Sequence, residues 1–373
     1  MTTEPTDPIK LPLDALHAEL GGKMVPFAGH SMPVQYAMGV MGEHLHTREK
    51  AGLFDVSHMG QMVIRGEGRA EALERLLPID VVGLKEGRQR YGLLMLPDGG
   101  VADDLMVANR GDHLLMVVNG AMKCLDLEIV QAGMPDHDVT LLEDRALLAL
   151  QGPSAEAVLA GLVPEAAEMR FMDVRTLDWD GTELWVSRSG YTGEDGYEIS
   201  VPVARAEAFA RALLAHEDAA PIGLGARDSL RLEAGMPLYG QDLTAETTPV
   251  EAGLGWAIQK VRRTGGAREG GFPGADRVLA ELAEGATRKR VGLRPQGRAP
   301  MRTGVALYAD ETGGDPVGEV TSGGFGPSVG APVAMGYVPA DCAVGTVLYG
   351  DVRGKRLPVT VADLPFHTPR YKR

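Results

Sequence analysis

Cysteine is scarce in this chain: Cys124 and Cys342 are the only two among 373 residues, and they lie far apart. Their separation matches no metal-ligand spacing and favours free thiols in a reduced compartment. Apolar runs are short as well, and none approaches the ~20 residues that a membrane-spanning helix needs. The segment from Met1 to Lys10 is polar and lacks the apolar core of a signal peptide. We therefore expect a cytoplasmic, bacterial-like protein without a targeting signal.

Positive charge is also in short supply, since 37 Lys and Arg residues face 51 Asp and Glu residues and the net charge is −14. Such acidity argues against general nucleic-acid binding. It leaves room for an anionic small ligand, because a local arginine cluster can override the overall field. The length of 373 residues exceeds one ordinary hydrophobic core and predicts two or three domains.

Hydrophobic periodicity predicts a protein that mixes helices and strands. Helices are expected at 13–20, 41–50, 69–77, 121–131, 153–162, 204–216, 223–234 and 276–284. Strands are expected at 61–65, 91–96, 105–108, 113–118, 147–151, 183–187 and 197–201. The glycine-rich stretch 262–274 indicates a linker. The short segments with Gly and Pro turns beyond residue 284 predict a small β-barrel or sandwich.

Two glycine-rich segments, Gly190–Glu198 and Gly225–Asp242, place aromatic and charged residues beside flexible backbone. This composition is typical of loops that bind a small, flat, polar ligand. Alternation along the strand that follows turns the side chain of Glu198 away from its apolar neighbours. Glu198 is therefore expected to act as a recognition carboxylate on a rigid element. Arg227 is either a ligand contact or a partner in salt bridges within its own helix.

Two adjacent acids, Asp103 and Asp104, follow a glycine turn at the start of a strand. Because neighbours in a strand point to opposite faces, at most one of them faces a given pocket. Asp and Gly also dominate turns, so the motif alone fits a polar hairpin turn at least as well.

Three other motifs are better explained by structure than by chemistry. Ser57 and His58 lack a nucleophile-elbow pattern, and adjacent residues serve each other poorly as nucleophile and base. His44 and His46 have a spacing that is wrong for two metal ligands on one helix face, which predicts a solvated helix. The glycine-rich run 321–326 lacks a phosphate-binding lysine and predicts a tight turn.

Several sequence blocks occur in a fixed order along the chain: 54–59, 99–105, 117–119, 150–153, 190–198, 225–242 and 320–323. Together they resemble the T-protein of the glycine cleavage system, the tetrahydrofolate-dependent aminomethyltransferase family. The resemblance extends from Leu13 to Tyr371. One departure is His30, which stands where such proteins often carry tryptophan.

The resemblance implies an α+β fold of three domains, a cloverleaf around a central folate channel with a C-terminal β-barrel. Its first domain would be discontinuous, and the expected bounds are 1–59 plus 145–257 for the first domain, 60–144 for the inserted domain, 258–274 for a linker and 275–373 for the barrel.

The resemblance also implies the reaction. The methylene of an aminomethyl group on the lipoyl arm of a separate H-protein would pass to tetrahydrofolate, with release of ammonia and no metal. Asp103 would be the catalytic carboxylate, with Asp104 second, and Glu198 would accept hydrogen bonds from the pterin. The other expected contacts to folate are Arg227, Tyr191, Tyr91, Asn119, Met59, Val117, Phe171 and Trp256.

Two alternatives stay open at this point. Folate-dependent demethylases share the fold, and so do non-catalytic folate-binding proteins. The latter typically carry a cysteine that is absent from the matching stretch Gly235–Gln241. For the H-protein, the candidate docking residues are basic, although a solvated charged surface explains them better: Lys260, Arg262, Arg263, Arg288, Lys289 and Arg290.

Overall fold

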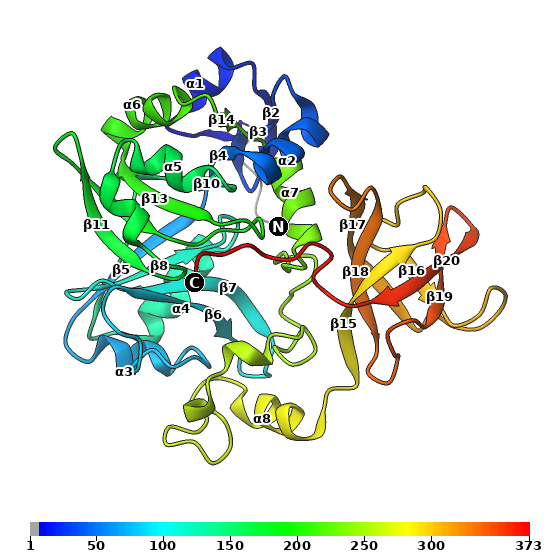
Figure 1. The fold of residues 1–373 in the computed structure, drawn as a ribbon. Helices are drawn as coiled ribbons and strands as arrows, with labels where there is room; N and C mark the ends of the chain where they lie inside the picture. The colour runs from blue at the N-terminus through cyan, green and yellow to red at the C-terminus, as the bar shows by residue number, and fades with distance from the viewer. Residues whose placement is uncertain (1–6) are drawn as a thin grey trace.

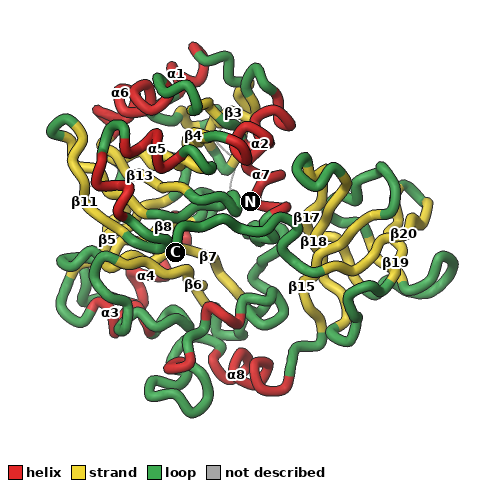
Figure 2. The backbone as a smooth tube through the Cα atoms, viewed as in Figure 1, coloured by secondary structure: helices red, strands yellow, loops and turns green. Residues whose placement is uncertain are grey.

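The computed structural model describes residues 7–373, which form three lobes, each built around strands (Figures 1 and 2). The expected mixture of helices and strands is confirmed. Within residues 7–373 no helix is long and apolar enough to cross a membrane. Residues 1–6 of the polar N-terminal segment lie outside the described residues.

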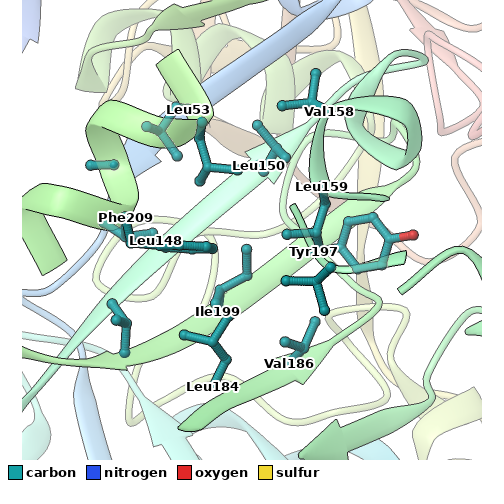
Figure 3. Packing of buried hydrophobic residues seen from close by; sticks show 14 of the residues in the cluster. Leu53, Leu148, Leu150, Val158, Leu159, Leu184, Val186, Tyr197, Ile199 and Phe209 are labelled. Atoms are coloured by element: carbon teal, nitrogen blue, oxygen red, sulfur yellow. The ribbon is translucent and has the colours of Figure 1, made fainter. Parts of the chain in front are cut away.

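The first lobe contains a six-stranded sheet with the order β11-β12-β13-β10-β4-β14. Its strands are β4 (Ala51–Asp55), β10 (Arg145–Gln151), β11 (Val174–Trp179), β12 (Thr182–Ser187), β13 (Gly196–Pro202) and β14 (Ala219–Pro221). Three helices pack apolar side chains against one face of this sheet: α1 (Asp14–Glu19), α5 (Ala155–Ala160) and α6 (Val203–Leu214). Figure 3 shows Val158 and Leu159 of α5 and Phe209 of α6 beside the strands. Tyr197, Ile199 and Val201 of β13 are fully buried on this face, which leaves Glu198 on the other, as alternation predicts.

Ile199 tests the packing of this core. Replacing Ile199 by Val removes one buried methylene, and we expect the free energy of unfolding to fall by about 0.5–1.5 kcal/mol. The same change at Ile9, which is 57% exposed, is the matched control and should cost less. Chemical denaturation of both variants measures the difference. Equal losses would contradict the buried position of Ile199.

The second lobe is a five-stranded sheet with the order β6-β7-β8-β5-β9, and it lies within the expected insert 60–144. Its strands are β5 (Gly60–Arg65), β6 (Arg88–Met95), β7 (Val101–Asn109), β8 (Leu114–Val118) and β9 (Asp138–Leu141). The helices α3 (Arg69–Glu74) and α4 (Lys123–Gly133) bring apolar residues into its core. Strands β7 and β8 are antiparallel, with Leu105 opposite Val118. The residue after β8, Asn119, therefore lies beside the first half of β7.

The third lobe is a closed barrel, as expected, with the strand order β15-β18-β17-β16-β19-β20. Its strands are β15 (Arg288–Pro295), β16 (Ala306–Tyr308), β17 (Gly318–Gly326), β18 (Ala331–Pro339), β19 (Val347–Val352) and β20 (Lys355–Ala362). The barrel interior is filled by its own apolar cluster. Closure removes the free sheet edges that would otherwise pair with other chains.

The remaining elements join these lobes. A three-stranded sheet has the order β1-β3-β2, with β1 (Ile9–Lys10), β2 (Lys23–Phe27) and β3 (His30–Gln35). The remaining helices are α2 (Gly39–Glu49), α7 (Leu224–Glu233), α8 (Ala275–Glu284) and short 3₁₀ turns at Pro164–Glu168, Gly255–Ala257 and Lys260–Arg262. Helix α7 packs against α2 and β3 on one side and against β17 of the barrel on the other. It therefore lies at the junction of the first and third lobes (Figure 1).

Polar contacts fasten the barrel to α7. The Arg231 guanidinium donates to Asp242 at 2.7 Å and to Ser322 of the barrel at 2.9 Å, and the Arg231 and Asp242 side chains are buried. Glu233 accepts the Ser328 backbone N–H at 2.8 Å. Because these charges are paired and hydrogen-bonded, their burial is compensated.

The C-terminal segment, residues 363–373, runs from the barrel back to the first lobe (Figure 1). The Arg370 N–H donates to the Gly193 carbonyl at 3.0 Å, and the Phe171 N–H donates to the Lys372 carbonyl at 2.8 Å. Tyr371 stacks on Phe171 with ring centroids 4.2 Å apart. The last residues thereby hold the loop that begins at Gly190.

Three sequence interpretations are wrong. Asp103 and Asp104 lie inside β7 instead of in a hairpin turn, because the strand begins at Val101. Residues 321–326 belong to β17, where a bulge between Val320 and Ser322 accounts for the small residues. His44 is fully buried instead of solvated, because α7 covers its face of α2.

Candidate active site

A pair of carboxylates forms where the end of β8 meets β7. The Asn119 backbone N–H donates to Asp103 Oδ2 at 3.0 Å, and Asn119 Nδ2 donates to Asp103 Oδ1 at 2.8 Å. The same amide donates to Asp104 Oδ1 at 2.9 Å. Asn119 therefore bridges the two acids and sets their positions.

The two acids differ in access. Asp103 has no exposed surface, and both of its oxygens are occupied by Asn119. Asp104 is only half-buried, and its Oδ2 accepts the Tyr91 hydroxyl at 3.0 Å. The catalytic role of Asp103 stays a prediction, and the geometry favours Asp104, the second candidate, as the carboxylate that meets a ligand.

Burial determines the electrostatics of Asp104. Loss of solvent, followed by the charge of Asp103, raises the pKa of the Asp104 carboxyl to about 7. The hydroxyl of Tyr91 and the amide of Asn119 act in the opposite direction. A carboxyl with a pKa near neutrality both accepts and returns a proton, which suits general acid–base catalysis.

Tyr91 and Trp256 form an aromatic wall beside this carboxylate. Their rings stack with centroids 5.5 Å apart and an interplanar angle of 26°. Burial, followed by the charge of Asp104, raises the pKa of the Tyr91 hydroxyl well above its usual value, so Tyr91 stays a donor at neutral pH. Trp256 is 63% exposed, so its ring is open to a ligand or a partner.

Glu198 lies on the face of the six-stranded sheet that looks toward the second lobe. The Ser189 hydroxyl donates to its Oε2 at 2.9 Å. Burial raises the pKa of the Glu198 carboxyl, while the hydrogen bond from Ser189 and the charge of Arg227 lower it. Its other oxygen accepts no hydrogen bond within residues 7–373 and is available to a donor on a ligand.

Arg227 and Arg231 occupy the same helix in different roles. Arg231 is nearly fully buried and is paired with Asp228 and Asp242. Arg227 stacks over the Tyr191 ring at 4.8 Å and forms no salt bridge among the described residues. Burial lowers the pKa of the Arg227 guanidinium. The salt-bridge alternative therefore holds for Arg231, whereas Arg227 is the cation left for an anionic ligand.

A narrow chamber with a cavity volume of about 20 Å³ lies between the two sheets. Its lining includes Glu198, Val117 and the polar side chains of Gln61, Gln89 and Arg110. Met59 and Val117 pack against the apolar cluster beneath α7. The chamber thus combines apolar walls with a few polar groups, as small-molecule sites do.

The comparisons with known proteins agree with this geometry. Residues 13–262 match the family model described as GCVT N-terminal domain, and residues 288–367 match the Glycine cleavage T-protein C-terminal barrel domain. The chain belongs to the glycine cleavage T-protein family of aminomethyltransferases.

Similarity extends over nearly the whole chain. The mitochondrial aminomethyltransferase of Dictyostelium discoideum is 43% identical over 383 residues, covering 98% of this chain and 94% of that protein. That of Gallus gallus is 44% identical over 370 residues, covering 96% and 93%. The crystal structure of glycine cleavage system aminomethyltransferase T from Bartonella henselae matches with a TM-score of 0.91 and 43% identity, covering 98% of this chain and 99% of that one.

The T-protein family is tetrahydrofolate-dependent, and the residues present fit that co-substrate. Glu198 offers an unfilled acceptor, Arg227 an uncompensated positive charge, and Asp104 a half-buried carboxyl. Within residues 7–373 no group of His, Cys, Asp and Glu side chains is arranged to hold a metal ion.

Phe171 lies apart from this cluster in its contacts. It stacks on Tyr371 of the C-terminal segment, so its contact with a folate ring stays a prediction. Ser189 is a contact of Glu198 that sequence reasoning missed. Ser189 lies nine residues before Glu198, just after the end of β12, and its hydroxyl donates to Glu198 on the neighbouring strand β13.

Most of the basic residues expected to dock the H-protein already form ion pairs or hydrogen bonds within this protein. Arg262 is 4% exposed and donates to Glu74 at 2.8 Å, so its docking role is wrong. Arg288 pairs with Glu251 at 3.0 Å, and Arg263 and Arg290 donate to backbone carbonyls. Such pairing consumes the donors that an acidic partner would need.

Proposed function

We propose that this T-protein takes the aminomethyl group from the lipoyl arm of H-protein and delivers its methylene to tetrahydrofolate. In the overall change the carbon loses its bonds to sulfur and to the amine nitrogen and gains bonds to N5 and N10 of the folate. The two protons released by those nitrogens go to ammonia and to the lipoyl thiol. The products are 5,10-methylenetetrahydrofolate, ammonia and dihydrolipoyl H-protein.

Asp104 is the residue that handles the proton in this proposal. Its carboxyl is held from two sides, by Tyr91 and by Asn119, and is partly exposed. An ionised Asp104 accepts a proton from a folate nitrogen and stabilises positive charge on the carbon during transfer. It then returns the proton to the leaving group. This positioned carboxylate is the observation that carries the proposal.

Glu198 and Arg227 orient the co-substrate. The free oxygen of Glu198 and the one shared with Ser189 accept the ring N–H and amino group of the pterin. Arg227 pairs with the negative charge on the glutamyl end of tetrahydrofolate or borders the folate pocket. Met59, Val117 and Asn119 line this pocket. Orientation of two reactants within a shared chamber is a large part of the rate enhancement that an enzyme supplies.

Two further proposals concern the domain bounds and the cellular location. We infer the domains as 1–59 plus 145–257, 60–144 and 275–373, supported by the separation of the six-stranded sheet, the five-stranded sheet and the barrel. A cytoplasmic location is our proposal, supported by the free thiols Cys124 and Cys342, whereas the similar proteins from Dictyostelium and chicken carry mitochondrial names.

One experiment tests the function directly. Purified aminomethylated H-protein is mixed with this protein, and ammonia is measured with and without tetrahydrofolate. We expect folate to stimulate release, with methylenetetrahydrofolate formed in equal amount. No stimulation from protein that is shown to bind folate would instead favour a demethylase or a non-catalytic folate binder.

Tyr91 gives a pH-dependent prediction. Turnover by wild-type protein should rise through about pH 7 as Asp104 ionises. Replacing Tyr91 by Phe removes a hydrogen bond that lowers the pKa of Asp104, so the rise should move to higher pH. The measurement is kcat from pH 5 to 9, with Tyr308→Phe in the barrel as control. A rise at unchanged pH would argue against Tyr91 as the partner that sets this pKa.

A further inference from the structure

A third carboxyl stands behind the pair that Asn119 bridges. Asp126 lies on α4, and like Asp103 it has no exposed surface. The Asp103 and Asp126 carboxyls are within hydrogen-bonding reach of each other. Both oxygens of Asp126 are buried, and no N–H or O–H donor among residues 7–373 reaches either of them.

The cations and hydrogen-bond donors near Asp103, Asp104 and Asp126 indicate which of the three carboxyls is neutral. Among the described residues, no Lys, Arg or His forms a salt bridge with Asp103, Asp104 or Asp126. An ionised carboxylate that is buried without donors is very costly. Asp103 has two donors from Asn119, and Asp104 has Tyr91 and Asn119. Asp126 has no such donor. A neutral Asp126 carboxyl would carry an O–H group that can donate to Asp103.

We propose that Asp126 is a positioning residue that remains a neutral carboxylic acid and donates its O–H to the Asp103 carboxylate. Asp103 is then held as an anion that orients Asn119, and Asn119 in turn orients Asp104. The chain of contacts connects a fully buried helix position to the carboxyl that meets the substrate. This proposal rests on the role of Asp104 put forward above.

Electrostatics supports the assignment. Burial, followed by the charges of Asp103 and Asp104, raises the pKa of the Asp126 carboxyl to about 9. The hydrogen bond with Asp126 lowers the pKa of Asp103, which burial raises. The other titratable groups that act on this cluster are Cys124 on α4 and the tyrosines Tyr91, Tyr191 and Tyr239. They are acidic groups too, so their ionisation also favours the neutral form of Asp126.

Two replacements of Asp126 test whether its side chain acts as a hydrogen-bond donor or only fills space in the core. Asp126→Asn keeps the shape and offers an amide N–H to Asp103, whereas Asp126→Leu has a similar size and no donor. We expect kcat of the Asn variant to stay near the wild-type value and that of the Leu variant to fall about 10–100-fold, as is usual for lost supporting hydrogen bonds. The dissociation constant for tetrahydrofolate should change little in either. Glu128→Gln, exposed on the same helix, is the matched control.

Two further readouts do not depend on turnover. At pH 8 Asp104 is mostly ionised, whereas Asp126 is still mostly protonated. The infrared spectrum of wild-type protein at this pH should contain the carbonyl stretch of a buried carboxylic acid, and this band should be largely lost in Asp126→Asn. The second readout is thermal unfolding against pH. Because the folded-state pKa lies above the unfolded value of about 4, the native state holds an extra proton between about pH 4 and 9. Wild-type stability relative to Asp126→Asn should therefore fall as pH rises through this window.

The outcomes are distinguishable. Equal loss of kcat in the Asn and Leu variants, no acid carbonyl band and a stability difference that is independent of pH would overturn the proposal. If Asp126→Leu does not fold, the infrared band and the pH dependence of Asp126→Asn still decide. Failure of folate to stimulate ammonia release by wild-type protein would refute the proposed function while leaving both of these readouts interpretable.

Discussion

Replacing Asp104 by Asn will lower kcat by about 10²–10⁴-fold, the usual contribution of a positioned acid or base. Asparagine keeps the size of the side chain and can still bond with Tyr91 and Asn119, but it accepts no proton. The dissociation constant for tetrahydrofolate should stay close to the wild-type value, because the pterin contacts are assigned to Glu198. Single-turnover ammonia release, combined with a folate titration, measures the two effects separately.

The matched control is Asp136→Asn, an exposed change in the same lobe, which should leave kcat unchanged. Asp103→Asn is the informative comparison, since the sequence alone placed the catalytic role there. It removes a buried charge and disturbs Asn119, so its effect passes through the position of Asp104. Normal turnover in Asp104→Asn together with a large loss in Asp103→Asn would return the role to Asp103.

Replacing Glu198 by Ala will weaken tetrahydrofolate binding by about 1–3 kcal/mol, a roughly 5- to 150-fold rise in the dissociation constant. The loss arises because the pterin donors would be buried without an acceptor. Once folate is saturating, kcat should recover much of its value, since the carboxyl at Asp104 is untouched. Isothermal titration calorimetry with tetrahydrofolate measures the change.

A second variant refines the interpretation of Glu198. Glu198→Gln keeps the volume but turns an amide N–H₂ toward the donors, so it should bind folate no better than the Ala variant. Glu217→Ala, exposed at the end of α6, is the control for general loss of charge. A dissociation constant that does not move in Glu198→Ala would remove Glu198 from the binding site.

The long periodic segments were predictable, and the strands that depend on distant partners were not. Helices α6 and α7 lie where apolar spacing placed them, and the short C-terminal strands form the expected barrel. The hairpin β2–β3 was missed because Pro26 and Pro33 break the usual strand pattern. Strand β11 was missed because it contains the charged residues Arg175 and Asp178. It lies at the edge of the sheet, and only its pairing with β12 defines it.

The candidate site was predictable residue by residue only where alternation is clear. Glu198 follows from its apolar neighbours, which all face the core. The same signal was available for the acid pair, because Asp103 shares a face with Leu105 and Val107, both buried. Asp126 shares the buried face of α4 with Val130, four residues on, and this spacing marks it as a core position. What a single sequence does not contain is the meeting of Asn119 with Asp103, which the pairing of β7 and β8 creates.

The path of the C-terminal segment has a consequence for how the site comes into being. A chain is synthesised from its N-terminus, and its domains begin to fold before synthesis ends. Both sheets that border the chamber are complete in sequence by Pro221, yet the loop at Gly193 receives its bond from Arg370, and Phe171 its stacking partner from Tyr371. The loop at Gly193 therefore gains this support only after residues 370 and 371 have left the ribosome. A nascent chain has both sheets early and the support of this loop later.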